Sequence, residues 1–77
     1  MKIVKLKWID SSSAPSGWEY IEDIPSLKPA ICHTIGYVLD ENKKFIVIAS
    51  TISKTQILGR IVIPKCCILK KKILFKK

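Results

Sequence analysis

Apolar and polar side chains alternate along the first ten residues of the chain. Val4, Leu6 and Trp8 fall on one side of this pattern, and the two lysines between them fall on the other. A period of two with apolar and β-branched residues is typical of a strand that buries one face. The pattern therefore predicts a half-buried strand over residues 2–9.

The next segment interrupts regular structure. Residues 11–18 are rich in serine and also contain proline and glycine, a composition typical of a loop. Trp18 and Ile21 then follow at a helical spacing, and Pro25 limits a helix here to about two turns. We therefore expect a short helix or an ordered loop over Gly17–Ile24, with Trp18 and Ile21 anchored in the core.

Apolar runs separated by short polar turns make up the rest of the chain. The expected strands are Ala30–Leu39, Phe45–Ser50, Ile57–Ile63 and Cys67–Phe75, with turns at Asp40–Lys44 and Ser53–Gln56. Gly36 and Gly59 fall inside these runs, where glycine marks a bulge or a sharp bend. Two bends allow a small sheet to curl and close on itself. The sequence therefore predicts a mainly β fold, a small five-stranded antiparallel barrel (SH3-like or Sm-like), in one domain over residues 1–77.

Composition limits the class of protein further. Hydrophobic residues make up 48% of the chain, which argues against disorder. The longest uncharged apolar stretch, Phe45–Ser53, is far shorter than the ~18–20 residues of a spanning helix. Lysines interrupt the N-terminal apolar residues, so the unbroken apolar core of a signal peptide is missing. We therefore expect a cytoplasmic protein with no membrane association.

The three cysteines favour no disulfide framework, because their number is odd and Cys66 and Cys67 are adjacent. Adjacent residues on a strand face opposite sides, so neither that pair nor Cys32–His33 aims both side chains easily at one ion. We expect the cysteines to be small buried hydrophobes and His33 to be a structural imidazole in an apolar strand. The sequence predicts no metal and no cofactor.

Charge is the strongest global signal. The formal net charge is +8, and residues 42–77 hold nine lysines, Arg60 and no acid. The positive electrostatic field of such a segment attracts nucleic acid, nucleotide phosphates or an acidic protein surface. Alternatively, the lysines can serve solubility or protect an edge strand against aggregation. The candidate residues for nucleic-acid or anion binding are Lys43, Lys44, Arg60, Lys65, Lys70, Lys71 and Lys72.

Other chemistry has little support in the sequence. Trp18 and Tyr37 are the candidates for base stacking or loop contacts, and a stacking surface for single strands needs more aromatic residues than these. No nucleophile and base occur in a catalytic pattern, and no glycine-rich phosphate loop is present. We therefore expect a protein that acts by binding and has no catalytic residue.

Residues 35–73 resemble the Sm-like (Hfq/Lsm) small barrel. The resemblance is carried by Gly36, the turn Asp40–Asn42, the apolar strand Phe45–Ala49, Gly59 and Ile63–Pro64. It implies oligomeric rings that bind RNA or nucleotides.

Nearly the whole chain is also similar to short uncharacterised bacteriophage proteins. This likeness is carried by residues 8–12 (Trp-Ile-Asp-Ser-Ser), 17–18 (Gly-Trp), 32–37 (Cys-His-Thr-Ile-Gly-Tyr) and 63–65 (Ile-Pro-Lys). It implies a small accessory phage protein in the host cell cytoplasm.

Three functions are therefore expected, in this order. The first is non-catalytic binding of nucleic acid or nucleotide through a basic face. The second is an oligomeric inhibitor or sponge of a host defence protein or signalling nucleotide, and the third is a structural accessory component. Self-association into a homo-oligomer is expected because a core of this size is marginal on its own.

Overall fold

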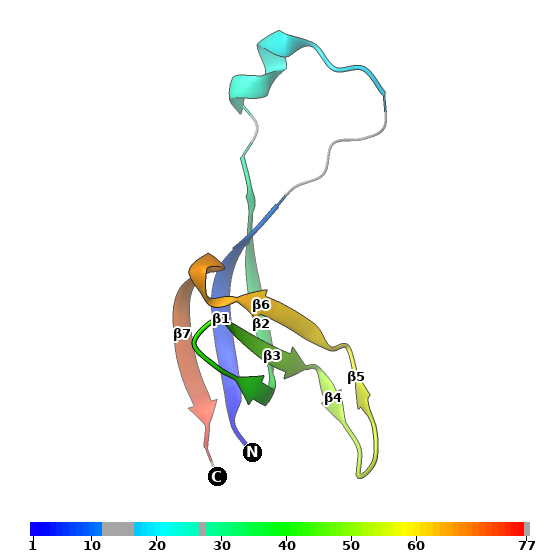
Figure 1. Cartoon of the computed structure of the whole chain (residues 1–77), viewed down its shortest axis with the longest axis vertical. Helices are drawn as coiled ribbons and strands as arrows, with labels where there is room; N and C mark the ends of the chain where they lie inside the picture. Colours follow the sequence, from blue (N-terminus) through cyan, green and yellow to red (C-terminus); the bar gives the residue numbers. More distant parts are fainter. Residues whose placement is uncertain (12–16, 27, 77) are drawn as a thin grey trace.

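The computed structural model describes residues 1–11, 17–26 and 28–76, which form a bent antiparallel sheet (Figure 1). The sheet has the strand order β6-β3-β2-β1-β7, and β4 pairs with β5 in a separate hairpin. The strands are β1 (Ile3–Asp10), β2 (Ala30–Glu41), β3 (Phe45–Ala49), β4 (Thr51–Ile52), β5 (Ile57–Leu58), β6 (Ile61–Pro64) and β7 (Ile68–Phe75), with 3-10 turns η1 (Ile21–Ser26) and η2 (Lys65–Cys67). The expected mainly β fold with five antiparallel strands is confirmed.

The expected closure into a barrel is wrong. Within the described residues, β6 and β7 each pair with one strand of the sheet and not with each other. The sheet does bend where the register of β2 and β3 shifts between Val38 and Asp40. Gly59, however, lies in the turn between β5 and β6 with φ 71°, so it ends a strand and does not curve one. β6 and β7 are therefore the two edges of an open sheet.

The core lies on the inner face of the bent sheet. Its buried residues come from β1, β3 and β6 and are Val4, Leu6, Trp8, Ile46, Ile48 and Ile63. The alternation seen in residues 2–9 therefore predicts the buried face of β1 correctly. The Trp8 indole Nε1–H donates to Thr34 Oγ1 at 2.9 Å, which satisfies its polar group next to the core.

Gly36 allows β2 and β3 to approach closely. A Cβ atom at this position would lie 2.8 Å from the Ala49 carbonyl oxygen and 3.3 Å from the Ile48 Cβ. Any side chain at Gly36 would therefore push these strands apart, just before the shift in register that bends the sheet.

The β1–β2 hairpin continues beyond the sheet into an arm, which we define as residues 17–26 and 28–29 (Figure 1). Trp18 is 104% exposed and Ile21 is 87% exposed, so the expectation that they anchor in the core is wrong. The ladder runs as far as the pair Asp10–Ala30 and carries the connecting segment away from the core. The Cα radius of gyration is 15.8 Å, against about 11–12 Å for a compact chain of this length.

Other boundaries differ from the expected ones. The helix or loop expected over Gly17–Ile24 is a 3-10 turn that begins only at Ile21, and residues 12–16 of the expected serine-rich loop lie outside the described residues. The expected strand Ile57–Ile63 is divided into β5 and β6. The turn expected at Ser53–Gln56 is confirmed, because the Gln56 N–H donates to Ser53 Oγ at 2.9 Å.

Candidate anion-binding face

Lysines gather on the outer face of β1 and β7. Lys5 and Lys7 alternate with the buried residues of β1, so they point away from the core. In the antiparallel ladder, Lys5 stands directly opposite Lys72, and Lys7 stands directly opposite Lys70. Residues directly opposite each other have Cβ atoms about 4.5–5.5 Å apart, and like charges in these positions repel. Two such pairs therefore concentrate four ammonium groups on one small area.

On its other side, β1 pairs with β2, which adds an imidazole to this group. His33 stands opposite Lys7 and is exposed, so the expected structural imidazole is wrong. Five side chains line one open hollow of about 330 Å³ on the outer face of the sheet, and no acidic residue lines it. We call this surface the lysine face, and its residues are Lys5, Lys7, His33, Lys70 and Lys72.

Apolar and aromatic side chains of β2 border the lysine face. Ile31 and Ile35 alternate with His33 on the outer side of the sheet and are 59% and 57% exposed. Tyr37 stands opposite Ile3 at the end of the same row and is half-buried. On the other side of Ile3, Phe75 of β7 stands opposite it and is exposed, so the lysine face has both apolar and aromatic neighbours.

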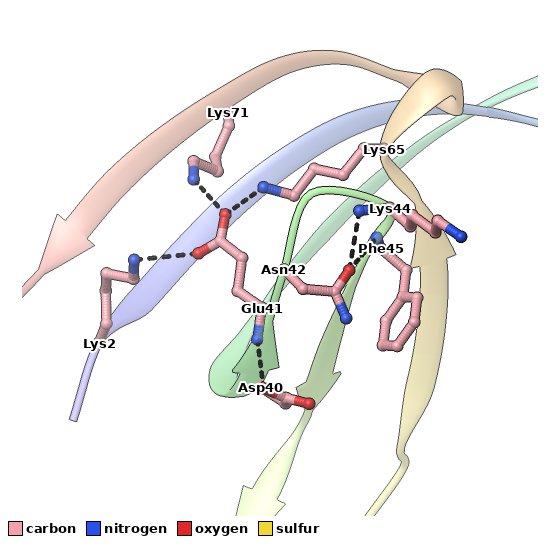
Figure 2. Close-up of polar contacts among 8 residues, drawn as sticks. All are labelled: Lys2, Asp40, Glu41, Asn42, Lys44, Phe45, Lys65 and Lys71. Carbon is pink, nitrogen blue, oxygen red and sulfur yellow. Dashed lines mark hydrogen bonds and ion pairs between the residues drawn. The ribbon is translucent and has the colours of Figure 1, made fainter.

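A second group of lysines surrounds a single carboxylate (Figure 2). Glu41 Oε1 lies 3.1 Å from Lys2 Nζ, whereas Glu41 Oε2 lies 2.5 Å from Lys65 Nζ and 2.6 Å from Lys71 Nζ. Hydrogen bonds from Lys65, then Lys71 and Lys2, lower the pKa of Glu41 to about 2 against the opposing effect of burial. We call these four residues the Glu41 clamp. It ties the start of β1 and the end of β2 to η2 and β7.

The β2–β3 turn positions the clamp. Asn42 Oδ1 accepts the backbone N–H groups of Lys44 at 2.8 Å and Phe45 at 2.9 Å. The Lys65 N–H in turn donates to the Lys44 carbonyl oxygen at 2.8 Å. This bond holds η2 beside the turn, so the Lys65 side chain reaches Glu41 (Figure 2).

The basic residues predicted from the sequence therefore separate into three groups. Lys70 and Lys72 belong to the lysine face, and Lys65 and Lys71 belong to the Glu41 clamp. The remaining predicted residues are exposed on separate turns, Lys43 and Lys44 between β2 and β3, and Arg60 between β5 and β6. The stacking candidates also lie apart, with Trp18 on the arm and Tyr37 on β2.

Sequence reasoning missed Lys5, Lys7 and His33 as members of the site. The alternation of β1 already places both lysines on the outer side of the strand. The information that was missing is the pairing of β1 with β7, which doubles the local charge.

The adjacent cysteines lie close together at η2. Cys66 Sγ and Cys67 Sγ are 4.0 Å apart, because these residues form a 3-10 turn and not a strand with alternating sides. The contact with Cys66 raises the pKa of the Cys67 thiol. Cys66 is exposed, so the expectation of a buried hydrophobe is wrong there. Within the described residues, no group of three or more His, Cys, Asp or Glu side chains could hold a metal ion.

Comparison of the chain with protein families, curated proteins and solved structures found no significant match. In the parts of the chain that the structure describes, no helix is long and apolar enough to cross a membrane. The lysine face is therefore the feature of the molecule from which a function can be inferred.

Proposed function

We propose that the protein binds nucleic acid, without catalysis, through the lysine face. One observation carries the proposal, namely the two cross-strand lysine pairs Lys5–Lys72 and Lys7–Lys70. Opposed like charges cost the folded state stability, and a polyanion laid across them removes this repulsion.

The shape of the face favours a polymer over a small molecule. Small-molecule sites are concave, mostly apolar and bury most of the ligand. The hollow here is open and is lined by four lysines and one histidine, which suits contacts with a phosphate backbone. Few aromatic rings border the face, Tyr37 and Phe75 on either side of Ile3, so we expect binding with little sequence preference.

From the residues that resemble short bacteriophage proteins, we further propose that the chain is an accessory protein of a phage. In the second candidate function, a sponge or inhibitor, the same lysines would hold the phosphates of a signalling nucleotide. The open form of the hollow is the reason to place a nucleic-acid backbone first.

The test is a titration of a short, labelled single-stranded oligonucleotide at increasing salt. If four lysines contact phosphates, log Kobs falls linearly with log salt with a slope of about −3. The variant Lys7→Gln/Lys70→Gln should reduce that slope by about 1.4, since each single-strand phosphate contact contributes about 0.7. Lys43→Gln/Lys54→Gln is the control, because it removes the same charge from exposed turns. An affinity that does not change over a tenfold range of salt would contradict the proposal.

A further inference from the structure

The arm combines exposed aromatic and acidic side chains. Trp18 is 104% exposed and Tyr20 is 75% exposed, with Glu19 between them and Glu22 close behind, both also exposed. Residues 11–31 contain one lysine against three acids. Exposed aromatic groups bordered by charge are typical of surfaces that bind a protein partner.

The lysine face has the opposite charge and similar apolar neighbours. Outside residues 11–31, the chain carries thirteen basic residues against three acids. The exposed side chains of Ile31 and Ile35 lie in the same row as His33, at the border of the lysine face. One copy of the chain therefore presents two surfaces that complement each other in charge and that both include apolar area.

We propose that the arm of one copy docks on the lysine face of a second copy. Every described side chain from 17 to 23 is exposed, so the arm does not rest on its own sheet. In the docked pair, Glu19 and Glu22 approach the lysines, and the rings of Trp18 and Tyr20 receive ammonium groups in cation–π contacts. A two-fold arrangement makes the same contact twice, which closes the assembly as a dimer.

The dimer does not depend on nucleic-acid binding, because both of its surfaces belong to this chain. It does oppose that binding, since the arm covers the lysines that a phosphate backbone would contact. We therefore expect added oligonucleotide to shift the protein from dimer to monomer.

The first test is the mass of the full chain by light scattering, without nucleic acid, at low and high salt. We expect a dimer at low salt that dissociates as the salt concentration rises, because charge complementarity at exposed sites is screened. A monomer at about 100 μM protein and low salt would overturn the proposal.

The second test is an exchange of charges between the two surfaces. Glu19→Lys/Glu22→Lys reverses the charge of these two positions on the arm, and Lys7→Glu/Lys70→Glu reverses the charge of two positions on the lysine face. Each variant alone should dissociate at least tenfold more readily than the wild type, whereas an equimolar mixture of the two should associate again. Lys43→Glu/Lys54→Glu has the same net charge as the reversed face and should remain a dimer.

Three results of this experiment would overturn the proposed dimer. One is a mixture that stays monomeric, and another is an equal loss of association in the control. The third is retention of the dimer by the arm variant, which would point to another interface, such as the open edges β6 and β7. The arm variant keeps the lysine face intact, so its oligonucleotide titration tests the proposed function separately.

Discussion

The three consecutive lysines of β7 differ in their electrostatic surroundings, because the middle one is paired with an acid and its two neighbours face other lysines. Lys71 donates to Glu41 at 2.6 Å, together with Lys2 and Lys65, so its charge is paired within the chain. Lys70 and Lys72 project from the other side of the strand, opposite two further lysines, into a hollow lined by no acid. One run of like residues thus serves two purposes, because successive side chains of a strand point to opposite faces. The ion pairs of the Glu41 clamp neutralise Lys71 within the chain, whereas no acid lining the hollow neutralises Lys70 and Lys72.

The largest effect should follow from reversing charge on the lysine face. Lys70→Glu/Lys72→Glu should lower oligonucleotide affinity about 100-fold at low salt, because two phosphate contacts become repulsive. The fold should persist, since each new carboxylate stands opposite a lysine of β1. Fluorescence anisotropy measures the affinity, with Lys43→Glu/Lys54→Glu as the variant of equal charge. Equal losses in the two variants would remove the distinction between the lysine face and the other lysines.

Removing the carboxylate of the clamp should give the next largest effect. Glu41→Gln leaves Lys2, Lys65 and Lys71 close together without an anion and should lower the free energy of unfolding by about 2 kcal/mol at neutral pH. Urea denaturation measures the change. Asp40→Asn is the matched control, because Asp40 is exposed and its Oδ1 accepts the backbone N–H of Glu41. A control that loses as much stability would show that the clamp contributes nothing of its own.

The stability that Glu41 contributes should disappear in acid. Its pKa is lowered from 4.5 to about 2 in the folded chain, so the contribution is fully present above pH 4.5 and is lost as the pH falls towards 2. Urea midpoints of the wild type and of Glu41→Gln should therefore converge over this range. Curves that remain parallel from pH 6 to pH 2 would contradict the assignment.

Loss of one clamp lysine should have a smaller effect. Lys71→Gln should lower the free energy of unfolding by about 1 kcal/mol, because Lys2 and Lys65 still neutralise the carboxylate. Oligonucleotide affinity should change by less than about twofold, since Lys71 does not line the hollow. Lys70→Gln is the comparison and should show the reverse pattern of weaker binding with little change in stability.

The smallest effect should be a gain in stability. Lys72→Glu replaces a repulsive cross-strand pair with an attractive one opposite Lys5 and should raise the free energy of unfolding by about 0.5 kcal/mol. The same variant should bind oligonucleotide more weakly than the wild type. No gain in stability would mean that solvent already screens the repulsion between these lysines.

The sequence predicts the parts of the fold that depend on local pattern. The alternation of Val4, Leu6 and Trp8 identifies the buried face of β1, and the polar residues 53–56 identify a turn. Closure of the sheet depends instead on pairing between strands far apart in the chain, and a local sequence pattern gives no information about that pairing. The same limit explains Trp18, whose size suggests a core anchor but whose position on the arm leaves it exposed.

The residues of the candidate site could likewise be predicted only as far as local sequence determines them. The charge of residues 42–77 drew attention to Lys70 and Lys72, but charge alone could not separate them from Lys71. That separation requires Glu41 to lie beside β7, thirty residues further along the chain. Lys5 and Lys7 become part of a concentrated positive charge only because β7 pairs with β1 and places two further lysines opposite them.

The pairing of β1 with β7 also governs the order in which the sheet can form. As the chain emerges from a ribosome, β1 and β2 can pair early, whereas the other edge of β1 has no partner until β7 is made. An unpaired edge strand invites pairing with another chain, and charged side chains, lysine above all, discourage it. Lys5 and Lys7 lie on that temporarily open strand. The lysines proposed to contact nucleic acid should therefore also discourage aggregation of the nascent protein before its fold is complete.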